Sequence, residues 1–135
     1  MNDFTVSDDV ADNLDIRASL DRHWKAVAAG KPATEDKIYH ADAVLDYPQT
    51  GERIVGLDNI KASRAADPDR GSITIYSLLG QADVWVTDYT ITRSGAPVHV
   101  VSVMEFRDGK VIRETQYICA AFAAPAWRAN WVQVG

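Results

Sequence analysis

The sequence predicts an α+β fold in which a curved, mostly antiparallel sheet carries about three N-terminal helices on its concave face. Helical patterns are confined to the first half of the chain, and the residues from Ser72 onward follow a β pattern. Ser94-Gly95 and Asp108-Gly109 supply turns that join the later strands as hairpins. A bent sheet with a lid of helices leaves a cone that side chains fill incompletely, which is a natural ligand pocket. A chain of 135 residues is expected to form one domain, here residues 1–135.

The first predicted helix starts at Asn13, a good N-cap, and runs to about residue 29, where Gly30-Lys31-Pro32 ends it. Several side chains recur on one face of this helix with a period of about 3.6 residues. They are Ile16, Leu20, His23, Trp24 and Val27. Because His23 belongs to this mostly apolar face, we expect it to point inward.

Turn residues divide the rest of the chain into shorter elements. Thr34 is a suitable cap for a second helix, and Gly56 interrupts the pattern before a third. The predicted elements are a helix over residues 34–40, strands over 44–47 and 53–55, and a helix over 58–66. The later strands are predicted over residues 73–79, 82–92, 98–107 and 110–122, followed by a helical turn or strand extension at 126–131.

Composition excludes several classes of partner. The net charge of -5 argues against nucleic acid and anionic membranes, both of which attract basic proteins. Residues 1–12 show no signal peptide, and no apolar run approaches the ~20 residues of a membrane span. The single cysteine, Cys119, excludes an internal disulfide and favours the reducing cytoplasm. Its sequence context predicts an inert, packed thiol.

Asp46 is the first candidate for chemistry. It ends a short strand just before Pro48, at a predicted helix-to-sheet junction where α+β folds often form a cleft. A carboxyl group that is half-buried in a cleft can have a raised pKa and can move protons. The alternative is a strand-end carboxylate that caps a turn or pairs with Arg53.

The last two strands are mixed on both faces, which differs from the clean alternation of a sheet with one solvated face. One face is expected to line a partly polar pocket and the other to meet a second subunit, and alternation alone leaves open which face does which. One set is Val98, Val100, Ser102, Met104 and Phe106 with Ile112, Glu114, Gln116 and Ile118. The other is His99, Val101, Val103, Glu105 and Arg107 with Arg113, Thr115, Tyr117 and Cys119.

Three motifs together resemble a known family. They are Tyr39-His40-Ala41-Asp42-Ala43-Val44-Leu45-Asp46-Tyr47-Pro48, Gly56-Leu57-Asp58-Asn59-Ile60 and Met104-Glu105-Phe106-Arg107-Asp108-Gly109-Lys110-Val111-Ile112. In this order the chain looks like the SnoaL-like branch of the nuclear-transport-factor-2-like superfamily, which includes ketosteroid isomerase, scytalone dehydratase and polyketide cyclases. The resemblance covers nearly the whole chain and implies a cone-shaped α+β barrel, often a homodimer packed sheet against sheet.

The resemblance also implies site residues. By comparison with ketosteroid isomerase, the general base falls on Asp46, and the oxyanion donors fall on His23 and Ser102. The implied substrate-binding residues are Tyr39, Tyr47, Trp85, Ser102, Met104, Glu114, Gln116 and Ile118. The implied dimer face holds His99, Val101, Val103, Tyr117 and Cys119.

These residues imply acid–base chemistry on a hydrophobic carbonyl or hydroxyl compound, by a lyase, isomerase or cyclase that needs no cofactor. Asp46 would abstract a proton, and His23 would polarise an oxygen or protonate a leaving hydroxyl group. Ser102 is a weak donor, and Glu114 and Gln116 make the pocket polar, so a steroid isomerase is not expected. No metal is expected either, because the three histidines lack ligand spacing.

Simpler interpretations accompany each residue. His23 can be a core histidine bonded to a backbone carbonyl, and Glu114 can form an ion pair with Arg93, Arg107 or Lys110 on a solvated face. Tyr39, Tyr47 and Trp85 can be core residues. Two other functions therefore stay open, a noncatalytic binding module for a small apolar ligand and a structural dimer with a filled cone. In the latter the filling residues would be Trp24, Tyr47, Trp85 and Phe106.

Overall fold

The computed structural model describes the backbone of residues 3–134 and the side chains of residues 12–134. Its helices are α1 (Asp3–Ala29), α2 (Pro32–Glu35) and α3 (Leu57–Ala66), with 3-10 turns at Asp36–Ile38 and Ala126–Arg128. The strands are β1 (Tyr39–Tyr47), β2 (Glu52–Val55), β3 (Ser72–Gln81), β4 (Val84–Arg93), β5 (Ala96–Arg107) and β6 (Lys110–Ala120). None of the helices within residues 3–134 combines the length and apolar character that crossing a membrane requires.

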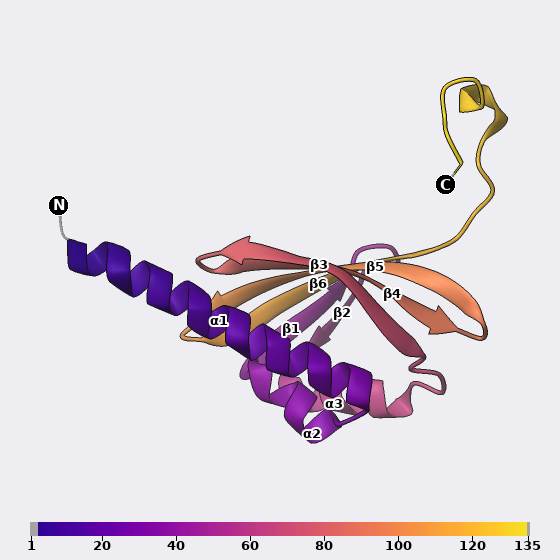
Figure 1. Ribbon diagram of the computed structural model, residues 1–135. Helices are drawn as coiled ribbons and strands as arrows, with labels where there is room; N and C mark the ends of the chain where they lie inside the picture. The colour runs from indigo at the N-terminus through magenta and orange to yellow at the C-terminus, as the bar shows by residue number, and fades with distance from the viewer. Residues whose placement is uncertain (1–2, 135) are drawn as a thin grey trace.

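The strands form a single curved sheet in the order β2-β1-β6-β5-β4-β3. All neighbouring pairs are antiparallel except β1 and β6, which run parallel. Figure 1 shows the three helices on one side of this sheet, with α1 lying across it. The predicted α+β fold, a curved and mostly antiparallel sheet with helices on its concave face, is confirmed.

The hydrophobic core fills the space between the helices and the concave face. Helix α1 contributes Leu20 and Trp24, and α3 contributes Ile60, all of them buried. The sheet contributes alternate residues, which point to the same face of each strand. These buried sheet residues include Leu45, Trp85, Tyr89, Val100, Met104, Phe106 and Val111.

Helix α1 begins at Asp3, ten residues before the predicted start at Asn13, so the prediction of an N-cap there is wrong. The side chain of Asn13 has another partner. Its Oδ1 accepts a hydrogen bond from the backbone N–H of Ala82 at 2.8 Å, in the turn between β3 and β4. A polar residue that favours helix ends in isolation is used here for a tertiary contact.

The predicted helix over residues 34–40 is too long. Helix α2 and its 3-10 turn end at Ile38, and β1 starts at Tyr39. Tyr39 is opposite Val111 of β6, and the register then shifts before Val44 pairs with Arg113. The irregularity hides the strand in the sequence, because residues 40–42 do not alternate between buried and exposed positions.

The predicted division of β5 and β6 into two faces is confirmed from Val98 to Met104, but a register shift then pairs Phe106 with the buried Val111, so the predicted alternation breaks at Ile112. Glu114 and Gln116 lie opposite Met104 and Ser102 on the concave face. His99 and Val101 lie opposite Cys119 and Tyr117 on the other face, which we call the outer face. The Cys119 thiol is exposed there, so the expectation of a packed thiol is wrong.

Candidate functional site

Asp46 does not lie in the cone. It is opposite Arg53 of β2 and Thr115 of β6, which places its side chain on the outer face. Arg53 donates to Asp46 at 2.6 and 3.1 Å, and an Arg113 nitrogen lies 2.9 Å from Asp46 Oδ2. The hydrogen bonds from Arg53, together with the charge of Arg113, lower the pKa of Asp46. The predicted cleft position and raised pKa are therefore wrong, and the alternative of a pair with Arg53 describes the structure.

His23 is buried as predicted, on the helix side of the sheet, with its ring 5.8 Å from the Tyr39 ring. Its Nδ1 lies 2.8 Å from the backbone carbonyl of Glu35, so this nitrogen carries the proton and donates. Burial lowers the pKa of His23, against the opposing influence of Glu114 and the Glu35 carbonyl. His23 borders a pocket that is also lined by Lys37 and Lys110, beside the C-terminal half of α1. The structure does not bring Asp46 and His23 together.

The open end of the cone is a pocket of about 550 Å³, which we call the mouth. Its walls are largely apolar and include Tyr47, Ile91, Val98 and Ile118. Tyr89 and Gln116 lie at its inner end, and Arg93 and Glu52 stand at its rim. A smaller pocket shares Tyr47, Ile91, Arg93 and Gln116 with the mouth and extends it toward Arg64 and Arg70. A few polar groups in an apolar cavity of this size are typical of sites for small molecules.

A short hydrogen-bonded chain lies at the inner end of the mouth. Gln116 Nε2 donates to the hydroxyl of Tyr89 at 3.1 Å, and the Tyr89 hydroxyl bonds Ser102 Oγ at 2.9 Å. Burial raises the pKa of Tyr89, so its hydroxyl keeps its proton across the physiological range. This group can therefore both donate to and accept from an oxygen of a bound molecule.

Glu114 lies one layer deeper and is fully buried. Its Oε1 accepts hydrogen bonds from the Tyr39 hydroxyl at 2.5 Å and from Arg64 at 3.2 Å, and its Oε2 accepts from Gln116 at 3.2 Å. Gln116 thus separates the carboxylate from the mouth. The solvated ion pairs that sequence suggested for Glu114 are not its partners.

Arg64 of α3 connects Glu114 to two further carboxylates, those of Glu35 and Asp36. Its Nη1 lies 3.5 Å from Glu35 and 3.8 Å from Asp36, and Arg70 also reaches Glu35 at 3.0 Å. Burial opposes the charge on Arg64, but the neighbouring Tyr39 and Glu114 oxygens raise its pKa. The result is a network of three buried carboxylates, the buried Arg64 and the partly exposed Arg70, which holds α3 and the segment around Glu35 and Asp36 against the sheet.

Asp36 is the least favourably placed carboxylate of this network. Burial and the neighbouring Glu35 raise the pKa of Asp36, and its Oδ1 has no hydrogen-bond partner among the described residues. A raised pKa in the folded state means that folding favours the protonated form. Stability from this group is present at acidic pH and is lost as pH rises through the folded pKa.

We therefore expect Asp36→Asn to stabilise the protein at pH 7 by about 0.5–2 kcal/mol, as removal of an unfavourable charge commonly does. The gain should shrink toward pH 4, where Asp36 takes up a proton in the wild type. Calorimetric melting of both proteins between pH 4 and 8 tests this, with Asp21→Asn on the exposed face of α1 as the control. A constant difference at all pH values would contradict the assignment.

The other predicted substrate-binding residues fall into two groups. Tyr47, Gln116 and Ile118 line the mouth. Ser102 and Glu114 lie behind it, within the polar chain and the ionic network. Tyr39, Trp85 and Met104 are buried in the core, and Trp85 Nε1 donates to the Ala82 carbonyl at 3.0 Å. For these three, the simpler interpretation as core residues matches their position.

Sequence reasoning missed Arg64 and Tyr89. Each carried a usable signal. Arg64 follows the buried Ile60 by four positions and so shares the inward face of α3. Tyr89 shares a strand face with the buried Trp85. Glu35 and Asp36 sit in a short polar segment with no periodicity, and no sequence signal marks them as buried.

The comparisons with known proteins agree with this architecture. The SnoaL-like domain family matches residues 20–114, and the chain belongs to this family. No curated protein matches the chain. A nuclear-transport-factor-2-like protein of unknown function from Burkholderia xenovorans is similar at 46% identity and a TM-score of 0.81, covering 90% of this chain and 96% of its own.

Two more distant structures share the fold. A candidate ketosteroid isomerase from Kribbella flavida is 22% identical with a TM-score of 0.84, covering 92% of each chain. A candidate polyketide cyclase from Sinorhizobium meliloti is 16% identical with a TM-score of 0.63, covering 73% of this chain and 93% of its own. Both structures show that this chain shares the fold of the nuclear-transport-factor-2-like superfamily.

Proposed function

We propose that this protein binds a small, mostly apolar molecule with a carbonyl or hydroxyl oxygen in the mouth of its cone. The observation that carries the proposal is the combination of apolar walls with the Tyr89–Gln116 pair at the inner end of the mouth. The apolar part of the molecule would lie against Ile91 and Ile118, and its oxygen would reach Tyr89 and Gln116. The family and its isomerase- and cyclase-named neighbours support the same class of ligand.

The activity we propose is that of a cofactor-free lyase, isomerase or cyclase. Tyr89 would hold the developing charge on the ligand oxygen, which a buried, protonated hydroxyl group does well. Glu114 would exchange the proton, after rotation of the Gln116 amide exposes Oε2 to the mouth. These two residues take the roles for which the sequence suggested Asp46 and His23.

A specific observation favours a second candidate, noncatalytic binding. Both Glu114 oxygens accept hydrogen bonds, and the carboxylate is fully buried behind Gln116. A base that is enclosed in this way performs no proton transfer unless Gln116 moves. The two candidates predict the same ligand contacts and differ only in whether the bound molecule is turned over.

We also propose that the protein is a single-domain homodimer that packs through its outer face. Large apolar side chains are exposed there, including Tyr76, Leu79 and Tyr117, at 63%, 67% and 52% of their surface. Exposed apolar groups that share one sheet face are typical of an interface. The free, exposed Cys119 thiol fits a reducing compartment such as the cytoplasm.

A thermal-shift screen against phenols, polyketide-like aromatics, terpenoids and steroids tests the ligand site. A compound at 100 times its dissociation constant should stabilise the wild type by ~2.7 kcal/mol. Gln116→Leu should weaken binding of the same compound on the order of 10-fold, because the oxygen of the ligand loses one donor. Gln81→Leu, at an exposed position outside the mouth, is the matched control.

Equal binding by the wild type and Gln116→Leu would contradict the proposed contact. Chromatographic analysis of each binding compound after incubation then separates the two activities. Turnover that Tyr89→Phe slows supports catalysis, and binding without any change in the compound supports the noncatalytic candidate.

A further inference from the structure

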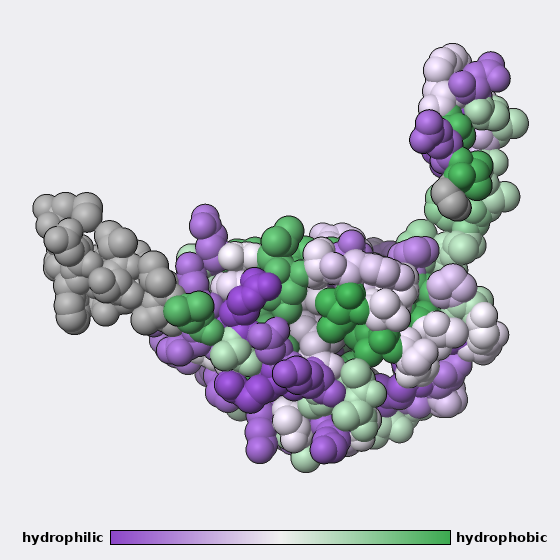
Figure 2. Space-filling model, in the orientation of Figure 1, coloured by the Kyte–Doolittle hydropathy of each residue, from purple (hydrophilic) through white to green (hydrophobic). Residues whose placement is uncertain are grey.

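Residues 121–134, which we call the arm, leave the body at the end of β6 and rise on the side of the sheet away from the helices (Figure 1). Figure 2 shows the arm standing clear of the rest of the molecule. The hydrogen bonds within residues 121–134 join the arm to itself. Ala129 N donates to the Ala126 carbonyl at 3.1 Å, and Trp131 N donates to the Arg128 carbonyl at 3.0 Å.

Three large aromatic side chains of the arm are exposed. Phe122, Trp127 and Trp131 are 76%, 75% and 77% exposed. Each such side chain can bury roughly 150–250 Å² when it packs against a partner. Three of them approach the ~800 Å² that one partner contributes to a stable protein interface. These side chains therefore need a surface that their own chain does not supply among the described residues.

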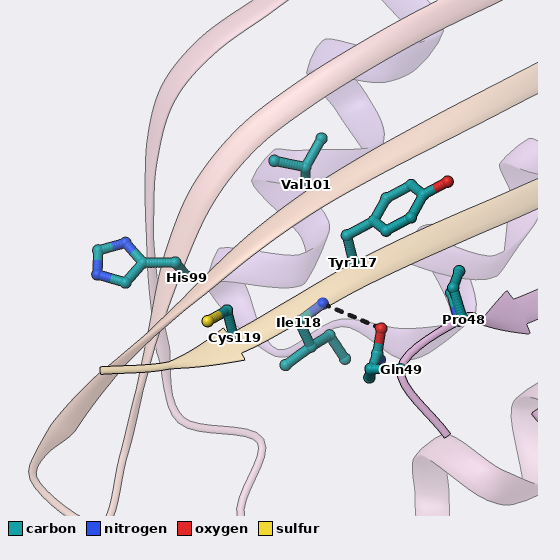
Figure 3. A pocket seen from close by; sticks show the side chains of 7 residues that line it. All are labelled: Pro48, Gln49, His99, Val101, Tyr117, Ile118 and Cys119. Atoms are coloured by element: carbon teal, nitrogen blue, oxygen red, sulfur yellow. Dashed lines mark hydrogen bonds between the residues drawn. The ribbon is translucent and has the colours of Figure 1, made fainter. Parts of the chain in front are cut away.

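A matching surface lies on the outer face. A groove of about 450 Å³, which we call the outer groove, runs along the ends of β5 and β6 next to the loop after β1. Figure 3 shows Val101 and Tyr117 projecting from neighbouring strands, with Pro48 and Gln49 on the far side of β6. Gln49 Oε1 accepts a hydrogen bond from Ile118 N at 3.4 Å, which holds the loop at the groove. The lining is mostly apolar.

We propose that the arm of one copy docks in the outer groove of a second copy, so that two copies exchange arms about a two-fold axis. The exchange goes beyond simple contact of the outer faces, because it assigns the arm a binding site on the partner. It rests on the proposed dimer and not on the proposed ligand or activity.

The geometry favours the partner's groove over the arm's own. The outer groove of the same copy lies next to the start of the arm. To fill this groove, the chain would have to reverse direction directly after Ala120. Pro125 instead has an extended backbone, with φ of -69° and ψ of 139°. The arm rises from the body up to its 3-10 turn and only then turns back on itself (Figure 1). Stacked sheets lie about 10 Å apart. An arm of this length can cross that gap, since an extended residue spans about 3.3 Å.

Charge also favours a second copy as the occupant. The arm contains Arg128 and no acidic residue, whereas the whole chain has a net charge of -5. The remainder of a second copy is therefore acidic, and this net charge attracts the arm at long range, while the groove itself is lined by apolar and neutral polar side chains. Within the arm, the Arg128 guanidinium lies over the Trp127 ring, 5.8 Å from its centroid.

The exchanged arm would also border the ligand site of the partner. The outer groove and the mouth share Gln49 and Ile118 in their linings. An arm seated in the groove lies at the edge of the mouth of the cone in the other copy. This consequence, unlike the exchange itself, depends on the proposed function.

Thiol cross-linking tests the exchange, because the only native thiol, Cys119, lines the outer groove. The chain with Ala129→Cys and Cys119→Ser is mixed with an equal amount of tagged wild type and oxidised gently. We expect a disulfide-linked heterodimer, which joins the introduced arm thiol to Cys119 of the other copy. Lys61→Cys with Cys119→Ser, which carries its thiol on exposed α3, should give little heterodimer.

A second variant distinguishes exchange of arms between two copies from docking of the arm in the groove of its own copy. In a chain that keeps Cys119 and carries Ala129→Cys, oxidation should give linked dimers, whereas an internal disulfide in a monomer would overturn the proposal. Trp127→Ser with Trp131→Ser should raise the dimer dissociation constant at least 10-fold in sedimentation velocity. An unchanged dimer that shows no arm-to-groove cross-link would also overturn the exchange, while leaving the outer-face dimer and the ligand site intact.

Discussion

Glu114→Ala should lower the free energy of unfolding by about 3–5 kcal/mol, the usual cost of removing one partner from a buried ion pair. The carboxylate is fully buried and receives hydrogen bonds from Tyr39, Arg64 and Gln116. Its removal leaves the Arg64 guanidinium, whose side chain is only 14% exposed, facing a cavity without its nearest counter-charge. Urea unfolding followed by circular dichroism measures the loss.

Glu105→Ala is the matched control. Glu105 lies on the outer face, its side chain is 44% exposed, and it pairs with Arg113 at 3.6 Å. An exposed pair of this kind contributes at most about 1 kcal/mol. A loss below ~1 kcal/mol for Glu114→Ala would contradict a buried ionic network behind the mouth. A second substitution, Arg64→Met, added to Glu114→Ala should cost less than the sum of the two single changes, because both remove the same ion pair.

Gly71→Ala is the second change with a large expected effect, a destabilisation of about 2–4 kcal/mol from backbone strain and overpacking together. Gly71 has a φ of +65°, which residues with a side chain rarely adopt. An added Cβ would lie 2.8 Å from Ile91 Cγ2 and closer still to the backbone carbonyl of Thr92. Neither neighbour can yield without disturbing the pairing of β3 with β4.

Gly95→Ala separates the two contributions. Gly95 also has a positive φ, of +78°, but nothing lies within 4 Å of an added Cβ. The control should therefore show only the backbone cost, about 1 kcal/mol. Equal losses for the two variants in thermal unfolding would show that the close approach of Gly71 to β4 is not a constraint.

The sequence predicted the architecture well, because the architecture depends on period and turns. Strand alternation put Glu114 and Gln116 on one face and His99 and Cys119 on the other, and the family resemblance assigned the first set to the concave face, as the structure shows. The helical period of α1 placed His23 inside. These signals are local, and local patterns specify which face of an element is buried.

The candidate site was harder to predict, because it depends on partners far apart in the sequence. The pairing of Asp46 with Arg53, seven positions later, was an alternative that the sequence offered. The contact of Asp46 with Arg113 crosses a parallel strand pair, which no local pattern reveals. The register shift after Tyr39 sets which face Asp46 occupies. A register shift of one residue would have placed the Asp46 side chain inside the cone.

The core residues show a similar limit. The tyrosines at 39 and 89 look alike in the sequence, yet the Tyr39 hydroxyl is bound to Glu114 and Arg64, and Tyr89 reaches the mouth. Their roles differ because β1 and β4 occupy different positions in the sheet. Depth along the cone, rather than residue type, decides which polar group can meet a ligand.

The most direct test of the ligand site is a crystal structure of the protein with a compound that stabilises it in the screen. We expect the compound in the mouth, between Tyr47 and Ile118, with an oxygen within hydrogen-bonding distance of Tyr89 or Gln116. A compound bound instead beside His23 or on the outer face, with the mouth filled by side chains or water alone, would contradict the proposed site.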